Sequence, residues 1–341
     1  MGLRSYIVKR LVYMVVLLFF VLSLNFVIFM LMPGDPTIMF VKAVKGQEKL
    51  MQEKLERWGL TQPIYIRYTK YLTNMITWQF GESFITGIPI AQTMLRRLKY
   101  TLTLLGASIA LSLIIGVILG VIAAHRRGGI FDSTAVIGSL ITYSLPVFWM
   151  GMLFILVFYS RLHWFPSAGA FPRAWGGNWP DPLIALNILG TTITMPSLVE
   201  IHGRLRHLFL PMVTLVLFQY GGWLLLTRAT MLETITEDYV LTAKAKGLSE
   251  RTILFKHALK NAALPLITNV ALSFGFMFSG AIITETVFTY PGVGKWIWTA
   301  ILNRDYPILQ ATFYVIGLCV IIANFLADIL YGVIDPRVKY G

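Results

Sequence analysis

Residues 238–261 read DYVLTAKAKGLSERTILFKHALKN, a polar stretch that lies between two long apolar runs of the chain. From Ser249 onward its apolar residues recur at helical spacing, with basic residues elsewhere around the helix. We expect Gly247 to form a flexible turn and Ser249 to cap the helix that follows it. The stretch therefore predicts a short amphipathic helix on the cytosolic face of a membrane protein, shaped to dock into another protein.

The composition places the rest of the chain in a bilayer. Of its 341 residues 56% are hydrophobic and 13% charged, and the mean hydropathy is +0.69, whereas soluble domains are about 45–50% apolar. Six runs are long enough to cross about 30 Å of hydrocarbon as helices. The sequence predicts an all-α polytopic protein with spans at 11–32, 101–124, 134–160, 209–231, 264–288 and 311–334.

Two further segments bear on the number of spans. The first run is longer than the apolar part of a signal peptide and no small-residue cleavage site closes it, so it is interpreted as an uncleaved helix. Residues 183–199 are interrupted by polar residues and Pro196, which favours an interfacial or re-entrant piece. The predicted divisions are the first helix to residue 32, an extracytoplasmic segment at 33–100, and a five-helix core at 101–341 with a cytosolic loop at 232–263.

Basic residues indicate the orientation. With six spans, the inner segments carry twelve Lys and Arg, and the short outer loop at 289–310 carries two. This bias favours cytoplasmic N- and C-termini. Arg96, Arg97 and Lys99, directly before the second span, run against the bias. The net charge of +13 is mostly explained by this topology and by a basic outer segment, and no nucleic-acid-binding module accompanies it.

The sequence shows no motif for catalysis, ion coupling or nucleotide binding. Ion-coupled carriers usually keep ionisable groups at membrane depth, yet here the charged residues of the spans, Arg228, Glu285 and Asp328, lie near predicted ends. The string PGVGKW at 291–296 lacks the hydroxyl of a phosphate-binding loop. The five His are scattered, and Cys319 is the single cysteine, so no catalytic, cofactor, metal or disulfide site is predicted. These absences favour a pore former whose energy comes from another polypeptide, with a stand-alone channel or carrier and a membrane enzyme as alternatives.

The stretch from 238 to 268 resembles the cytosolic signature loop of ABC-importer permeases, in the form found in the dipeptide/oligopeptide/nickel family. Matching strings keep the family order over the whole chain: YIVKRL (6–11), MPGDP (32–36), GLTQPIYIRYTKYL (59–72), FGESF (80–84), TLTLL (101–105), SLPVFWMGML (144–153), TETVFTYPGVGKW (284–296), RDYPILQ (304–310) and ADILYGVIDPR (327–337).

The resemblance is to the first, B-type permease subunit, and it implies the type I ABC-importer permease architecture. It also implies a heterodimer with a second permease, two cytosolic ATPases and an extracytoplasmic solute-binding protein. The general importer signature opens with Glu-Ala-Ala, where this chain has Leu241, Thr242 and Ala243. Its closing proline is displaced to Pro265. Both departures fit the peptide-permease variant.

By this resemblance, residues of about 248–260 form a coupling helix that sits in a groove of an ATPase and moves as a rigid body. Lys256 and Lys260 are expected to face acidic groups of that partner. The simpler reading is that the basic residues only satisfy the inside-positive bias. The residues assigned to the ATPase-coupling loop are Asp238, Tyr239, Ala243, Ala245, Lys246, Gly247, Leu248, Ser249, His257, Leu259, Asn261 and Pro265.

Helix breakers within spans suggest where a pathway opens. Pro146 in the third span and Gly221-Gly222 in the fourth are expected to kink or thin their helices. The alternative is that the glycines only let helices approach closely. Neighbouring residues that could line a path are Tyr143, Phe148, Gln219, Tyr220 and Trp223.

The outer segments carry aromatic and amphipathic stretches. Residues 49–60 and 64–78 are expected to form amphipathic helices on the outer membrane surface, where basic residues attract anionic headgroups, or a cap that receives the binding protein. Trp164, Trp175 and Trp179 lie in an outer loop suited to contacting the binding protein or the interface. The resemblance implies di- or oligopeptides as the cargo, with oligosaccharides and nickel as alternatives.

Overall fold

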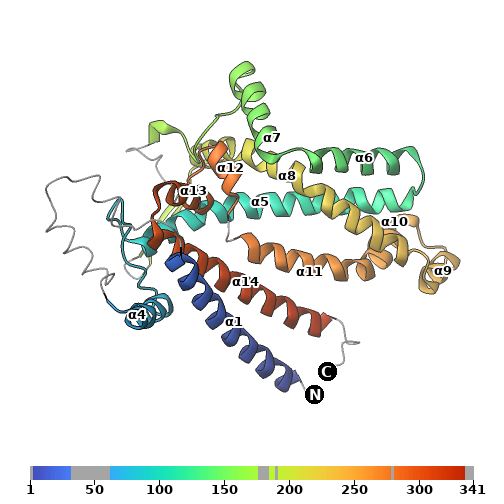
Figure 1. Cartoon of the computed structure of the whole chain (residues 1–341). Coiled ribbons are helices and arrows are strands. Elements are labelled where there is room, and N and C mark those ends of the chain that lie inside the picture. Colours follow the sequence, from blue (N-terminus) through green and yellow to red (C-terminus); the bar gives the residue numbers. More distant parts are fainter. Residues whose placement is uncertain (1–2, 32–61, 176–183, 189–190, 278–279, 335–341) are drawn as a thin grey trace. The chain divides into compact units, whose positions relative to one another are not determined.

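The computed structural model describes residues 3–31, 62–175, 184–188, 191–277 and 280–334 (Figure 1). The predicted helix at 49–60, the MPGDP string and Trp179 lie outside these residues. The chain divides into two compact units, one formed by residues 1–99 and 296–341 and the other by residues 100–295.

The first unit is built on two long helices. Helix α1 (Leu3–Leu31) packs along α14 (Tyr306–Ile334), and the approach is close enough that a side chain on Gly317 would press on Val21 (Figure 1). These helices contain the first and sixth predicted spans. A third helix, α4 (Ile64–Ile76), confirms the amphipathic helix predicted over 64–78.

Two buried polar residues tie this unit together. The Asn25 amide in α1 donates to the Tyr71 hydroxyl of α4 at 2.9 Å and to the Gln310 carbonyl of α14 at 3.0 Å. Burial raises the pKa of Tyr71, so its hydroxyl stays neutral. The Asp305 carboxylate accepts from the Ser83 hydroxyl at 2.5 Å and from the Phe84 amide at 3.1 Å. The FGESF and RDYPILQ strings, far apart in sequence, therefore meet at one carboxylate.

The second unit is a bundle of long helices. It contains α5 (Ile90–His125, which begins in the first unit), α6 (Ile130–Ser144), α8 (Leu198–Thr234) and α11 (Leu259–Met277). Helix α8 packs against both α6 and α11. Gly116 and Gly120 of α5 lie directly against α8, where a Cβ would overlap Trp223 and Thr227. Small residues thus bring these helices close, as in other membrane bundles.

The third predicted span is not one straight helix. After α6 the chain breaks at Leu145, and α7 (Val147–Phe154) starts at Pro146 and continues as a π-helix, η1 (Ile155–Arg161). The two halves are bent by 94°. The kink expected at Pro146 is confirmed, but a bend this sharp makes the segment a broken span or a re-entrant loop.

The fifth predicted span is shorter than the sequence suggested. Helix α11 covers its first part and ends at Met277, and the short helices α12 (Ile282–Val287) and α13 (Val293–Asn303) follow. Glu285 therefore lies in α12 and not in a long span. Within the described residues four helices are long and apolar enough to cross a membrane, or five if the bent pair counts as one span.

Residues 183–199 contain no span in the described part of the chain. Strands β1 (Ile184–Ile188) and β2 (Thr191–Met195) pair antiparallel, with Ile184 opposite Met195 and Ile188 opposite Thr191. A single helical turn, η2 (Arg173–Trp175), precedes them. Ser197 then caps α8 by accepting from the Glu200 amide at 3.2 Å. Apart from this hairpin the described chain is helical, which confirms the all-α prediction.

Candidate functional site

The polar stretch at 238–261 begins with a separate short helix, α9 (Asp238–Ala245). Its end is fixed by Gly247, whose φ of +70° is open to glycine at little cost. The Gly247 amide donates to the Lys244 carbonyl at 2.9 Å and the Leu248 amide to the Ala243 carbonyl at 3.4 Å. This pair of bonds is the Schellman arrangement that ends many helices. The turn predicted at Gly247 is therefore present as a defined helix stop.

The residues after the turn do not form a separate helix. Ser249 caps α10 (Glu250–Thr252), as predicted, by accepting from the Thr252 amide at 3.4 Å. The chain continues through a π-helix, η3 (Ile253–Ala258), directly into α11. The helix predicted over 248–260 thus consists of α10 and η3 and runs without a break into α11, and α9 is the separate helix of the loop.

Apolar contacts attach this loop to the ends of the long helices. Val240 and Ala243 of α9 pack with Ile253 of η3 in one buried cluster. A second cluster joins Ala258 and Ala262 to α5 and α8 through Val121, Ala124 and Met231. Of the apolar residues that recur at helical spacing after Ser249, Ile253 and Ala258 are buried and Leu254 and Leu259 are half-buried. Packed side chains therefore join α9 to η3, and join η3 and α11 to α5 and α8.

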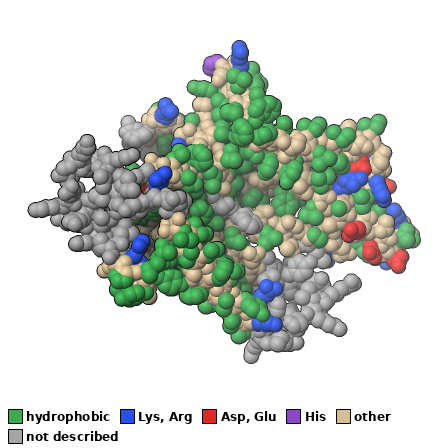
Figure 2. Space-filling model, viewed as in Figure 1, with side chains coloured by type: hydrophobic (Ala, Val, Ile, Leu, Met, Phe, Trp, Pro, Cys, Tyr) green, Lys and Arg blue, Asp and Glu red, His purple; other side chains and the backbone are tan. Residues whose placement is uncertain are grey.

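The outer side of the loop combines exposed apolar and charged residues. Leu241 is 59% exposed, and Tyr239, Leu248 and Phe255 are also exposed. Figure 2 shows Lys, Arg, Asp and Glu side chains gathered at the end of the unit where α9 and α10 lie. Of the predicted coupling residues, Ala243 is buried, three are half-buried (His257, Leu259, Pro265), and the others are exposed: Asp238, Tyr239, Ala245, Lys246, Gly247, Leu248, Ser249 and Asn261.

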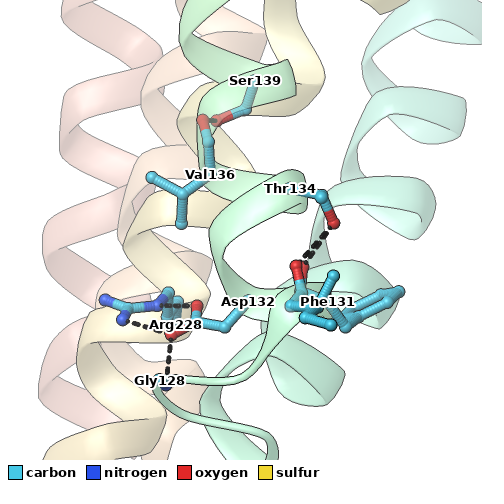
Figure 3. Close-up of polar contacts among 8 residues, drawn as sticks. Gly128, Phe131, Asp132, Thr134, Val136, Ser139 and Arg228 are labelled. Atoms are coloured by element: carbon cyan, nitrogen blue, oxygen red, sulfur yellow. Dashed lines mark hydrogen bonds and ion pairs between the residues drawn. The ribbon is translucent and has the colours of Figure 1, made fainter.

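An ion pair at the same end of the unit was missed by the sequence reading. The Arg228 guanidinium of α8 donates to both carboxylate oxygens of Asp132 in α6, at 2.6 and 2.8 Å (Figure 3). Asp132 also accepts from the Gly128 amide at 2.9 Å. Arg228 lies near the end of its span, as expected, but its partner lies 96 residues away on a neighbouring helix. The pair holds α6, α8 and the turn between α5 and α6 together.

A cavity of about 890 Å³ opens in the same unit between α5, α6, α8, α11 and α12. Among the predicted pathway residues Tyr143, Gln219 and Trp223 line it, and Pro146, Phe148 and Tyr220 are not among its lining residues. The Tyr143 ring stacks on Phe218, also in the wall, with 5.5 Å between centroids. The lining residues of this cavity carry no formal charge.

The two adjacent glycines of α8 have different surroundings. A Cβ on Gly221 would stand 3.0 Å from the Ser139 carbonyl oxygen of α6, so this glycine allows close helix packing. A Cβ on Gly222 would meet nothing within 4 Å, and Gly222 lines the cavity. The packing interpretation therefore applies to Gly221 and the lining interpretation to Gly222.

Glu285 lies in α12, directly after Thr284 of the cavity wall. It is fully buried, accepts from the Thr101 hydroxyl of α5 at 2.8 Å and from the Lys295 amide at 3.0 Å. Thr101 in turn accepts from the Val293 amide at 2.8 Å. A Cβ on Gly292 would overlap the Glu285 carboxylate. The glycines of the PGVGKW string therefore make room for a carboxylate and not for a phosphate.

Within the described residues no group of three or more His, Cys, Asp or Glu is placed to hold a metal ion. Among the outer tryptophans, Trp164 is exposed and Trp175 packs over Gly203 of α8. The functional features of this unit are thus the polar loop, the ion pair beneath it and the uncharged cavity.

These features define a multi-pass membrane permease, and comparison with known proteins gives its family. Residues 116–340 match the family described as the binding-protein-dependent transport system inner membrane component, and residues 3–105 match the N-terminal model of such membrane components. The chain belongs to this family. The resemblance to ABC-importer permeases found in the sequence is confirmed.

Relatives match along the whole length. The chain is 36% identical to the di/tripeptide transport system permease protein DppB of Pseudomonas aeruginosa, over 98% of this chain and 99% of that protein. It is 33% identical to the oligopeptide transport system permease protein AppB of Bacillus subtilis, over 99% and 100%. The dipeptide transport system permease protein DppB of Escherichia coli is also 33% identical, over 98% and 99%.

Breaking the ion pair is expected to destabilise the protein. Asp132→Ala leaves Arg228, whose side chain is 28% exposed, without its partner, at a cost of about 3 kcal/mol or somewhat less. A matched control is Glu200→Ala, which removes the more exposed pair with Arg204 (2.8 Å) and costs about 0.5 kcal/mol. Thermal unfolding in detergent measures both. Equal melting temperatures for the two variants would contradict the role given to Asp132.

The adjacent glycines are expected to respond to alanine with opposite signs. Gly221→Ala forces α8 away from Ser139 and costs about 1–3 kcal/mol. Gly222→Ala points into open space and gains up to about 1 kcal/mol from helix propensity. The melting temperatures of the two variants test this difference, and a loss of stability in both would show that Gly222 also serves packing.

Proposed function

We propose that this chain is the first permease subunit of an ATP-driven importer of di- and oligopeptides. The observation that carries the proposal is the full-length match to permeases named for peptide transport, at 33–36% identity. The N- and C-termini lie in the cytoplasm, and the polar loop with α9 lies on the same side. Residues 33–100 lie outside, which is the division expected from the Lys and Arg bias.

The chain works as part of a larger assembly. A second permease completes the translocation path, two cytosolic ATPases supply the energy, and an extracytoplasmic solute-binding protein delivers the cargo. The chain itself hydrolyses no ATP. The family description, which names a binding-protein-dependent transport system, supports this composition.

The ATPase docks on the exposed side of α9 and its turn. Exposed Leu241 and Leu248 supply apolar contact area, and the surrounding Lys and Arg residues complement acidic groups of the partner. Because Val240 and Ala243 bury the opposite side of α9 against η3, the docked helix moves together with α11. The second buried cluster and the Asp132–Arg228 pair carry that motion to α5, α6 and α8.

The uncharged cavity forms this subunit's share of the path. Gln219, Asn269 and Ser273 offer hydrogen bonds to a peptide backbone, and aromatic and aliphatic residues fill the rest of the wall. A wall of this kind accepts side chains of either charge, which suits peptides of varied sequence. Selection among cargoes is then left to the binding protein.

Uptake by cells that carry the complete importer tests the cargo. Accumulation of a labelled dipeptide is expected to require this chain and active ATPases, and to be competed by unlabelled di- and oligopeptides. An oligosaccharide and Ni²⁺ serve as parallel competitors. If the oligosaccharide or Ni²⁺ competes with the labelled dipeptide and the unlabelled peptides do not, the peptide assignment is wrong. Uptake that persists without the ATPases would indicate a channel or a gradient-driven carrier.

Gly247→Pro tests the coupling role of the loop. Proline cannot adopt a positive φ and has no amide for the Lys244 carbonyl, so α9 loses its fixed end. ATP hydrolysis by the assembled complex is expected to continue while peptide uptake falls by about tenfold or more, since coupling depends on this turn.

The matched control is Gly87→Pro. Gly87 has a φ of +66°, open space around it and an amide bonded to Ser83 at 3.0 Å, but it lies in the first unit. It therefore reports the general effect of such a substitution on uptake. Normal uptake by Gly247→Pro, or an equal loss in both variants with assembly intact, would remove the support for this loop as the coupling element.

A further inference from the structure

Helix α4 lies against the last part of α1. The Tyr68 hydroxyl is 2.7 Å from the Ser23 hydroxyl, and the Phe26 ring stands 5.2 Å from that of Tyr68 and 5.4 Å from that of Tyr71. The apolar stretch of α1 ends at Leu31. At 1.5 Å per residue Phe26 lies about 7.5 Å and Ser23 about 12 Å below that end, measured along the helix. Interfacial helices bury their apolar side to a depth of about 5–10 Å, so α4 sits at the level of the lipid headgroups.

The two flanks of α4 differ in character. On one side of its buried ridge stand Tyr65, which is 67% exposed, and Ile76, which is 61% exposed, with Leu72 between them at helical spacing. On the other side Arg67, Lys70 and Asn74 follow at spacings of three and four residues. The apolar flank suits contact with acyl chains, and the basic flank faces away from it.

The basic flank borders a cavity of about 410 Å³ that lies wholly within the first unit. Arg67, Lys70, Asn74 and Gln79 line it as hydrogen-bond donors, and Glu82 also lines it. Phe26, Met75 and Phe80 supply apolar wall. In the described part of the chain neither Arg67 nor Lys70 forms an ion pair. Two cations, two amides and one carboxylate thus meet around a headgroup-sized space at headgroup depth.

We propose that this cavity binds the headgroup of a phospholipid with a primary amine, phosphatidylethanolamine, from the outer leaflet. Arg67 and Lys70 hold the phosphate, as basic side chains do in other phosphate sites. Glu82 accepts from the ammonium group. The acyl chains leave along the apolar side of α1 and α4. The proposal rests on the extracytoplasmic placement of residues 33–100 given above.

A peptide also carries one anionic and one ammonium end. The depth of the cavity favours the lipid, because the contacts of α4 lie alongside the apolar stretch of α1 and not beyond it. The exposed apolar flank of α4 also favours a lipid ligand, because acyl chains would cover it. Peptide binding is therefore one of the outcomes that the experiment separates.

Native mass spectrometry of the intact importer in lipid nanodiscs provides the test. The nanodiscs contain equal amounts of phosphatidylethanolamine, phosphatidylcholine and phosphatidylglycerol. The native chain is expected to keep phosphatidylethanolamine in preference, and Arg67→Gln with Lys70→Gln to lower its occupancy about tenfold, since two charged phosphate contacts are lost. Glu82→Gln is expected to shift the preference toward phosphatidylglycerol.

Two controls guard the interpretation. Lys9→Gln with Arg304→Gln also removes two exposed cations of the first unit and is expected to leave occupancy unchanged. Arg67→Lys with Lys70→Arg keeps the charges and is expected to retain the lipid. Unchanged melting temperatures show that the variants fold.

The proposal is overturned if the native chain keeps no lipid, if the Gln pair keeps as much lipid as the control pair, or if an added dipeptide displaces the lipid. Labelling of Thr73→Cys, at an exposed position opposite the buried ridge of α4, by an impermeant thiol reagent tests the sidedness separately. Labelling only from the cytosol would refute the orientation. If the reagent labels from outside and the variant with Arg67→Gln and Lys70→Gln keeps its lipid, the lipid site alone is refuted. The proposed transport function is then unaffected.

Discussion

Water is absent from the hydrocarbon core of a bilayer, and both units of this protein are arranged to satisfy polar groups without it. Each backbone span is helical, and several buried charged and amide side chains have partners on other elements. Asn25 joins three helices, Asp305 holds the FGESF loop, and Glu285 accepts from the Thr101 hydroxyl and from a backbone amide in the first turn of α13. Because every such pair spans two or more elements, satisfying the polar groups also fixes how the helices pack.

This constraint separates the rigid parts of the second unit from the adaptable ones. The ion pair, the Glu285 contacts and the glycine-mediated approach of α5 to α8 define a fixed frame. The loop around α9 is attached to that frame by small apolar clusters and otherwise exposed. The cavity lies within the frame and has no charged group in its wall. An exposed contact surface, a rigid frame and an uncharged path are the parts that a permease driven by a partner protein requires.

Local features of the structure could be predicted from the sequence, and long-range ones could not. Gly247 and Ser249 were identified because a helix stop and a helix cap depend on neighbouring residues alone. The break at Pro146 was expected, but its 94° angle depends on what α7 packs against. The partner of Arg228 was missed because no local pattern links it to Asp132. The hairpin at 184–195 was missed because its polar interruptions resemble those of a poor span. The continuity of η3 with α11 was missed because polar Lys260 and Asn261 separate the amphipathic pattern from the apolar run of the fifth predicted span.

Helix α8 has a mechanical consequence that follows from its length. It runs unbroken from Leu198 to Thr234, and Arg228, where it is clamped to α6, stands near one end. At 1.5 Å per residue the segment beyond the clamp measures about 9 Å and the segment before it about 45 Å. If α8 pivots at that clamp, the ratio of the two arms is about five to one. If the clamped end of α8 turns, the long arm turns together with α5 and α6, because α5 packs on it at Gly116 and Gly120 and α6 packs on it at Gly221.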